Sequence, residues 1–455
     1  MGKELLIATL RHERTNTVPW VPFAGVHAGK LAGYDAKEVL TNADSLYESL
    51  MAAHKFYAPD GMPVAFDLQI EAEAFGCELL WARDNPPSVR SHPLADTNDI
   101  PCKCKIPNEK SGRVPVILET MRRLKASVGT ETALYGLVCG PFTLASHLRG
   151  TGIFMDMINQ PDYVARLVEY CGEVALSMAR MYLDAGMDVI ALVDPLVSQI
   201  SPKHVDQFLN PTFTAVFDYI RSRGAYSCFF VCGNATRQID AMCRMNPDCV
   251  SVDENVTLAL AKQTTDRYNI VLGGNIPLTT TMLFGTQQDN MKKVIDILDS
   301  VDHHNLIVSP GCDMPYDTPV ENVIAAAQAV KTPEEIRAAI AHYESAGLGN
   351  IEVELPDYGK LHRALVEVFT LDPDQCAACM YMVDLVKDHY DRISDIADYT
   401  VYRYNRREDI ARTVKMGLTN LPTICINGKP AWVSIIPGAD EFIAAVRDAY
   451  CALHP

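Results

Sequence analysis

The feature that most constrains the fold of this chain is a repeated alternation of short apolar runs with longer amphipathic stretches. Short apolar runs bounded by Gly, Pro and Asn are typical of buried parallel strands. Eight such runs are Trp20–Gly25, Pro63–Asp67, Leu134–Gly140, Val189–Asp194, Cys228–Cys232, Cys249–Asp253, Ile270–Gly274 and Leu306–Pro310. Apolar residues recur at helical spacing between most of them, as in Asp162–Ala185, Pro202–Arg221 and Gln288–Val301. This count and size predict an α/β fold, a (β/α)₈ TIM barrel, rather than a doubly wound sheet.

The chain continues beyond the expected barrel. Two further helices are predicted at Val320–Val330 and Pro333–Ser345, after which Ala346-Gly-Leu-Gly-Asn350 interrupts the pattern as a linker does. A chain of 455 residues also exceeds one ordinary hydrophobic core. We therefore expect a barrel over residues 1–346 and a small second α/β domain over residues 350–455.

Composition excludes several classes of partner. The net charge of −17, without a basic run, excludes a nucleic-acid partner, because phosphate backbones require a basic face. The longest apolar stretches are too short to cross a bilayer, so no membrane partner is expected. The 14 cysteines, with no apolar leader at the N-terminus, indicate reduced thiols and a cytoplasmic protein.

The second domain carries a dithiol motif. A strand expected at Val366–Thr370 leads to Cys376-Ala-Ala-Cys379, which opens a helix. Because a helix N-terminus favours a thiolate, we expect Cys376 to be the attacking thiol and Cys379 the buried resolving one. Pro422 is predicted to be cis and to face the dithiol, and Asn427-Gly428 predicts a hairpin turn. Half of a zinc site is the alternative, but no second Cys-x-x-Cys or His pair lies nearby. This domain resembles the thioredoxin-like fold.

Acids and thiols gather at the expected mouth of the barrel. The carboxyl ends of barrel strands face the site, and here they carry Asp67, Gly140, Asp194, Cys232, Asp253, Asn275 and Cys312, with His27 after the first strand. The absence of Lys and Arg at these ends favours a metal site over an anion pocket. Structural roles stay open: buried core thiols for the cysteines, and turns or helix caps for the aspartates.

Motifs along the barrel carry a family resemblance. Phe66-Asp67, Gly140-Pro-Phe-Thr-Leu-Ala145, Asp194-Pro195 with Ser201-Pro202, and Cys232-Gly-Asn234 occur in order. Over residues 5 to about 340 the chain resembles the uroporphyrinogen decarboxylase superfamily. Its decarboxylases carry arginines after the first strand and a His-Gly turn at the last strand. This chain has neither, and its Pro310-Gly-Cys312 is similar instead to the cobalamin-dependent methyltransferases of the superfamily.

The resemblance implies a chemistry and a site. Such enzymes move a methyl group from methylcobalamin, usually on a small corrinoid protein, to a small thiol such as coenzyme M, with the acceptor sulfur held on zinc. It assigns the metal to Cys232, Cys312 and Asp253 or its neighbour Glu254, and it gives Asp67 and Asp194 the shaping of the pocket. His27, Asn234 and Asn275 are the expected cofactor contacts.

One position departs from the pattern. The motif His-x-Cys requires a histidine two residues before Cys232, where this chain has Phe230. A phenyl ring cannot ligate a metal, so Cys228, on the same strand face, or Asp253, Glu254 or His27 would have to replace it.

The leading hypothesis is a cytoplasmic, cobalamin-dependent methyltransferase whose dithiol domain keeps thiols reduced or delivers a thiol substrate. The main alternative is a tetrapyrrole- or corrinoid-binding redox protein without zinc, in which Cys232 and Cys312 cycle as a dithiol serviced by Cys376 and Cys379. A decarboxylase-like lyase and a non-enzymatic corrinoid-binding or chaperone protein also stay open.

Overall fold

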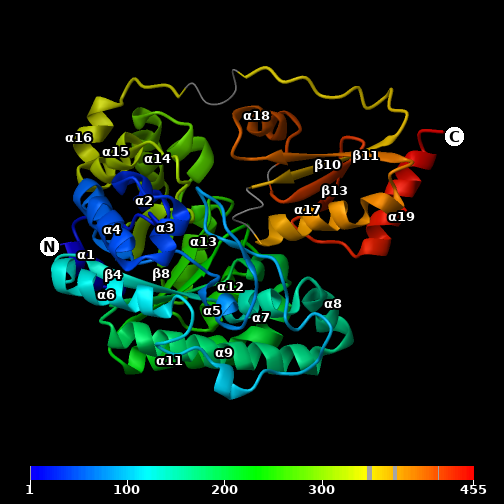
Figure 1. Cartoon of the computed structure of the whole chain (residues 1–455). Coiled ribbons are helices and arrows are strands. Elements are labelled where there is room, and N and C mark those ends of the chain that lie inside the picture. Colours follow the sequence, from blue (N-terminus) through cyan, green and yellow to red (C-terminus); the bar gives the residue numbers. More distant parts are fainter. Residues whose placement is uncertain (1, 346–350, 372–376, 419, 455) are drawn as a thin grey trace. The chain divides into compact units, whose positions relative to one another are not determined.

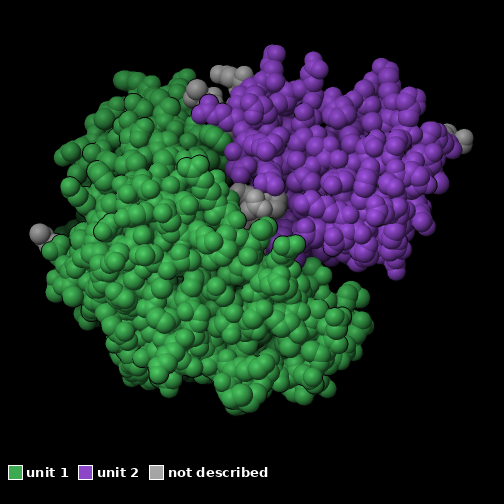
Figure 2. Space-filling model, viewed as in Figure 1, with its two compact units in different colours: residues 1–345 green, residues 346–455 purple. Residues whose placement is uncertain are grey.

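The chain folds into two compact units, residues 1–345 and 346–455 (Figure 2). The computed structural model describes residues 2–345, 351–371, 377–418 and 420–454. Among the described helices, none combines the length and the apolarity that crossing a membrane requires.

The first unit is built on a parallel sheet with the strand order β1-β4-β5-β6-β7-β8-β9. Its strands are β1 (Gly61–Pro63), β4 (Ala133–Cys139), β5 (Val189–Val193), β6 (Tyr226–Val231), β7 (Cys249–Val252), β8 (Val271–Ile276) and β9 (Leu306–Pro310). The residues around Trp20 close the ring, since Val21 N–H donates to Val308 O of β9 at 3.0 Å and Trp20 O accepts from Asp60 N–H at 2.9 Å. The fold is therefore a TIM barrel, as the sequence predicts.

Helices surround this sheet (Figure 1). They are α1 (Gly2–Leu10), α2 (His27–Ala32), α3 (Ala36–Thr41), α4 (Ala43–Tyr57), α5 (Ile70–Ala74), α6 (Val114–Val128), α7 (Pro141–Arg149), α8 (Gly152–Asn159), α9 (Pro161–Asp184), α10 (Pro202–His204), α11 (Asn210–Ser222), α12 (Ile239–Arg244), α13 (Leu258–Arg267), α14 (Gln287–Ser300), α15 (Val320–Lys331) and α16 (Pro333–Ala339). A short hairpin, β2 (Leu79–Leu80) and β3 (Ser88–Val89), lies outside the barrel sheet. Strands β4, β5 and β7 are buried along their whole length, because helices cover one face and packed side chains fill the other.

Four expected elements differ in detail. The strand expected at Trp20–Gly25 is reduced to a single bridge between Trp20 and Val308, and the strand expected at Pro63–Asp67 ends at Pro63. The helix expected over Pro202–Arg221 is interrupted by a π-helical segment at Val205–Leu209, two residues before Pro211, whose ring removes a backbone donor. The helix expected at Pro333–Ser345 ends at Ala339.

The second unit is a mixed sheet with the order β11-β10-β12-β13. Its elements are β10 (Ala364–Thr370), α17 (Ala377–His389), β11 (Ala397–Arg403), α18 (Arg407–Lys415), β12 (Thr423–Ile426), β13 (Lys429–Val433) and α19 (Ala439–Cys451). Strand β10 is parallel to β11 and antiparallel to β12. The predicted hairpin at Asn427-Gly428 is confirmed, with φ of 50° and 77°, and so is the cis Leu421–Pro422 bond.

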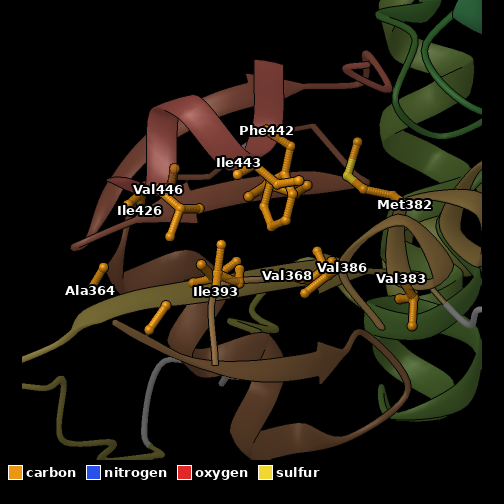
Figure 3. Packing of buried hydrophobic residues seen from close by; sticks show 13 residues of the cluster. Ala364, Val368, Met382, Val383, Val386, Ile393, Ile426, Phe442, Ile443 and Val446 are labelled. Carbon is orange, nitrogen blue, oxygen red and sulfur yellow. The ribbon is translucent and has the colours of Figure 1, made fainter. Parts of the chain in front are cut away.

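This sheet has its own core (Figure 3). Met382, Val383 and Val386 from α17, with Phe442 and Ile443 from α19, pack with the apolar side chains of β10 and β12. A separate core of this kind is what an independent domain requires.

Candidate functional site

Two cysteines meet at the carboxyl end of the barrel. Cys232 follows β6 and Cys312 lies two residues after β9, and parallel pairing brings both strand ends to the same edge. Their Cα atoms are 6.1 Å apart across 80 residues of sequence, and their sulfurs are joined in a disulfide. Both side chains are half-buried, so the pair lies at the surface of the mouth.

Acidic side chains flank this pair. Asp253 accepts hydrogen bonds from the N–H of Gly233, next to Cys232, and from Asn255 N–H at 2.7 Å, and burial raises its pKa. Glu254 accepts from Leu278 N–H at 3.3 Å and lies against Gly311, where an added Cβ would be 2.4 Å from Oε2. Asp313 directly follows Cys312 in the sequence and is buried.

Two of these carboxyl groups are only partly hydrogen-bonded. Within the described ranges, Glu254 Oε2 and Asp313 Oδ1 are buried without a hydrogen-bond partner. Burial raises the pKa of both groups well above the usual range for a carboxyl group. The mouth therefore carries buried, incompletely hydrogen-bonded carboxyl groups beside its two sulfurs.

An aromatic cluster occupies the position of the missing histidine. Phe230 on β6 lies with its ring centroid 4.9 Å from Phe23 and 5.9 Å from Phe66, and all three side chains are buried. Cys228, a possible replacement ligand, lies instead 3.4 Å from Ser251 Oγ. An apolar ring cluster therefore stands where the motif places its histidine.

These residues do not present a zinc site in this form. Across the part of the chain that the structure describes, no three His, Cys, Asp or Glu side chains are grouped so as to hold a metal ion. Structural and catalytic zinc sites use three or four protein ligands, with cysteines bound as thiolates. The oxidised pair supplies no thiolate, so the donor set as it stands does not fit zinc.

Asp194 joins β5 to helix α7. Its carboxylate accepts from Phe142 N–H at 2.9 Å, Thr143 N–H at 3.0 Å and Thr143 Oγ1–H at 2.6 Å, so it caps α7 from a neighbouring strand. Gly140 makes this approach possible, since a Cβ there would lie 2.2 Å from the Asp194 Cβ. Burial raises the pKa of Asp194 to about 7.

Asp67 lies in a buried ion-pair network. Its Oδ2 pairs with Arg113 Nη1 and its Oδ1 accepts from Gln69 N–H at 2.9 Å, which is a local turn rather than a helix cap. Arg113 Nε also binds Glu73 Oε2 at 2.6 Å, and the guanidinium lies 5.0 Å from the centre of the Trp81 ring.

The expected cofactor contacts have protein partners. His27 is buried, with Nδ1 2.9 Å from Tyr316 O and Nε2 2.6 Å from Tyr57 Oη, and burial lowers its pKa to about 4. Asn275 donates to Asp253 O at 3.0 Å and to Val256 O at 2.7 Å. Asn234 Oδ1 accepts from Thr236 N–H at 3.2 Å in the loop after Cys232. Roles for these three side chains in binding a cofactor stay predictions.

The dithiol of the second unit is described in part. Cys379 is buried in α17, while Cys376 lies outside the described residues.

Two acidic residues of the first unit were missed by sequence reasoning. Asp313 directly follows Cys312, and that adjacency could have identified it. Glu71 lies four residues after Asp67, accepts from Cys139 N–H at 3.1 Å at the end of β4, and burial raises its pKa to about 7. Helical spacing from Asp67 is the signal that could have identified Glu71.

The first unit is thus a TIM barrel with two cysteines and several buried acids at the carboxyl ends of its strands. The chain belongs to the uroporphyrinogen decarboxylase (URO-D) family, whose model matches residues 1–333.

The relatives include two kinds of enzyme. The chain is 28% identical to methylcobamide:CoM methyltransferase MtbA of Methanosarcina acetivorans, over 70% of this chain and 95% of that protein. It is 24% identical to uroporphyrinogen decarboxylase of Prochlorococcus marinus, over 67% of this chain and 87% of that protein. A solved methyltransferase from Methanosarcina mazei superposes with a TM-score of 0.65 at 25% identity, covering 72% of this chain and 98% of that one.

Proposed function

We propose that this protein is a methyltransferase that moves a methyl group between a corrinoid and a thiol acceptor. The observation that carries the proposal is the Cys232–Cys312 pair at the mouth of a barrel similar, over 95% of that relative's length, to a methylcobamide:CoM methyltransferase. A corrinoid, free or on a partner protein, is the methyl donor, and a small thiol is the acceptor. The protein acts in the cytoplasm, where thiols stay reduced.

The site divides between polar and apolar functions. In the transfer, a C–S bond forms as the C–Co bond breaks, its electron pair stays on cobalt, and the acceptor S–H proton leaves. The sulfurs and acids after β6, β7 and β9 form the polar wall that meets the acceptor. The rings of Phe23, Phe66 and Phe230 form an apolar floor that excludes water, which would otherwise solvate the attacking sulfur. Asp194 and Asp67 hold the loops around this wall.

Zinc at Cys232, Cys312 and Asp253 stays a prediction for the reduced protein. Reduction would supply two thiolates beside Asp253, and this concentration of negative charge needs compensation by a cation.

The test measures by absorbance how fast methylcobalamin is consumed in the presence of each of a panel of thiols. It compares the reduced wild-type protein with Cys232→Ser and Cys312→Ser. Both variants should lose the thiol-dependent rate, while Cys451→Ser, at an exposed cysteine in the second unit, should keep it. If Cys232→Ser and Cys312→Ser both keep the wild-type rate, the assignment is refuted. Zinc content, measured on the same samples, separates the metal from the reaction.

The second unit would be a thioredoxin-like redox module. Support comes from the order β11-β10-β12-β13, the cis Leu421–Pro422 bond and the helix that contains Cys379. Its dithiol would keep the barrel thiols or the acceptor reduced.

A second candidate is a corrinoid- or tetrapyrrole-binding redox protein that uses Cys232 and Cys312 as a dithiol. The bonded sulfurs favour this candidate. A reduced protein that binds corrinoid but transfers no methyl group to any thiol would support it over the methyltransferase.

A further inference from the structure

A second thiol pair lies outside the barrel mouth. Of the described cysteines other than Cys232 and Cys312, eight are buried and three are exposed. Two of the exposed ones, Cys102 and Cys104, belong to one short segment, Cys102-Lys103-Cys104-Lys105. Exposed cysteines are uncommon in folded proteins, and two within three residues form a site with its own chemistry.

The two cysteines interact and are not equivalent. Cys104 N–H donates to Cys102 Sγ at 3.3 Å, at the start of the 3₁₀ turn η1 (Lys103–Lys105). Hydrogen bonds from Cys104 and the charge of Lys105 lower the pKa of Cys102, while the Cys102 sulfur raises the pKa of Cys104. One thiol of the pair is thus prepared to attack and the other to resolve.

The backbone around the pair is anchored while the sulfurs remain exposed. Tyr170 Oη donates to Cys102 O at 3.1 Å, Lys103 Nζ pairs with Glu173 at 2.5 Å, and Ser177 Oγ donates to Pro107 O at 3.0 Å. The three anchoring residues are spaced three and four positions apart on α9, so they share one face of that helix. A fixed backbone keeps the two sulfurs near one another and open to solvent.

We propose that Cys102 and Cys104 are a redox-active thiol pair that reacts with disulfides and closes into an intramolecular disulfide. The Cys102 thiolate attacks one sulfur of a disulfide R–S–S–R, and the S–S bond breaks to release R–S⁻, which takes a proton. The Cys104 thiol then loses its proton and displaces the second R–SH from the mixed disulfide. Two thiols of the protein are oxidised and one external disulfide is reduced to two thiols, so electrons and protons balance.

The pair is independent of the methyltransferase proposal, because it uses no residue of the barrel mouth. The same two sulfurs could instead bind a soft monovalent or divalent cation. The opposite pKa shifts of the two thiols favour disulfide exchange, and so does the lack, among the described residues, of a third side chain grouped with them as a metal ligand. The experiment distinguishes the two outcomes.

The experiment equilibrates the full-length protein in glutathione buffers of stepped potential, blocks remaining thiols with N-ethylmaleimide and maps tryptic peptides by mass spectrometry. Cleavage after Lys103 would leave the Cys102 and Cys104 peptides joined only by a disulfide. We expect this linked, unlabelled product to form in wild type and in Cys451→Ser. It should vanish in Cys104→Ser, where glutathione is instead trapped on Cys102, and in Cys102→Ser, where Cys104 reacts more slowly.

Two results would overturn the proposal. In the first, glutathione adds separately to Cys102 and Cys104 in wild type and no linked product forms at any potential. In the second, one equivalent of Zn²⁺ or Cu⁺, added to the reduced chelator-treated protein, protects both cysteines from alkylation and glutathione never links them. That result would assign a metal site instead.

Discussion

Removing the charge of Asp67 should destabilise the barrel more than removing a charge from a solvent-exposed ion pair does. The Asp67 side chain is 0% exposed and its partner Arg113 is 8% exposed, so solvent compensates neither charge well and each is neutralised chiefly within the pair. In Asp67→Asn the amide keeps the size of the carboxylate, and its oxygen can still accept from Gln69 N–H. The change therefore removes chiefly the charge that faces Arg113.

The size of the effect follows from burial. Breaking a buried pair by removing one partner costs about 3–5 kcal/mol, because the other charge is left uncompensated. Arg113 retains Glu73, whose side chain is 31% exposed, so we expect about 3 kcal/mol, the lower end of that range. The control Glu73→Gln removes a more solvated charge and should cost about 1 kcal/mol or less.

The assay is urea unfolding followed by tryptophan fluorescence, with Trp20 as a fully buried reporter inside the barrel. A cycle with Arg113→Met and the double variant should give a coupling free energy of about 2 kcal/mol or more, since the two groups are in contact. If Asp67→Asn unfolds within about 0.5 kcal/mol of wild type, the pair does not stabilise the fold. Asp67 would then be retained for the reaction instead.

Two further predictions concern the mouth. Burial raises the pKa of Asp194 from 3.8 to about 7, so between these pH values the folded protein holds a proton that the unfolded chain has released. Its contribution to stability is complete below pH 3.8 and is lost as pH rises through 7, and Asp194→Asn should reduce the fall in urea midpoint between about pH 4 and pH 7; an unchanged pH profile would contradict this. Phe230→His should raise the zinc affinity of the reduced protein, measured by equilibrium dialysis, because it restores the histidine ligand of the His-x-Cys motif beside Cys232, Cys312 and Asp253; a variant that binds zinc no better than wild type would show that the mouth is organised around the aromatic rings.

The barrel could be predicted from the sequence because its strands are buried on both faces. Such strands appear as continuous apolar runs, and Leu306–Pro310 was placed with the bounds that the structure has. The same logic placed Cys232 and Cys312 at one edge. Local pattern also predicted the hairpin at Asn427-Gly428, since a tight turn requires residues that tolerate positive φ.

The partners of the site residues could not be predicted, because they come from distant parts of the chain. Arg113 lies 46 residues from Asp67, and neither position carries a pattern that indicates the other. The sequence predicts that Asp194 shapes the pocket, with a turn at Pro195 as the structural alternative, yet its carboxylate caps a helix that begins more than 50 residues earlier, after the side-chain-free Gly140. Sequence spacing predicts which strand ends converge, but it does not predict which hydrogen bonds then saturate each carboxylate.

The disulfide of Cys232 and Cys312 and the thiolates required for the proposed reaction cannot exist at the same time. A sulfur bonded to another sulfur has no thiolate charge to offer a metal or an acceptor, so the disulfide of Cys232 and Cys312 must open before thiol-dependent chemistry can occur there. Opening it requires two electrons from a dithiol, and the Cys-x-x-Cys of the second unit belongs to the same polypeptide. A donor on the same chain acts at an effective concentration that an external reductant seldom reaches, provided that the linker lets the two sites meet. Under the proposed function, the fused dithiol unit would therefore serve to keep the two barrel cysteines reduced.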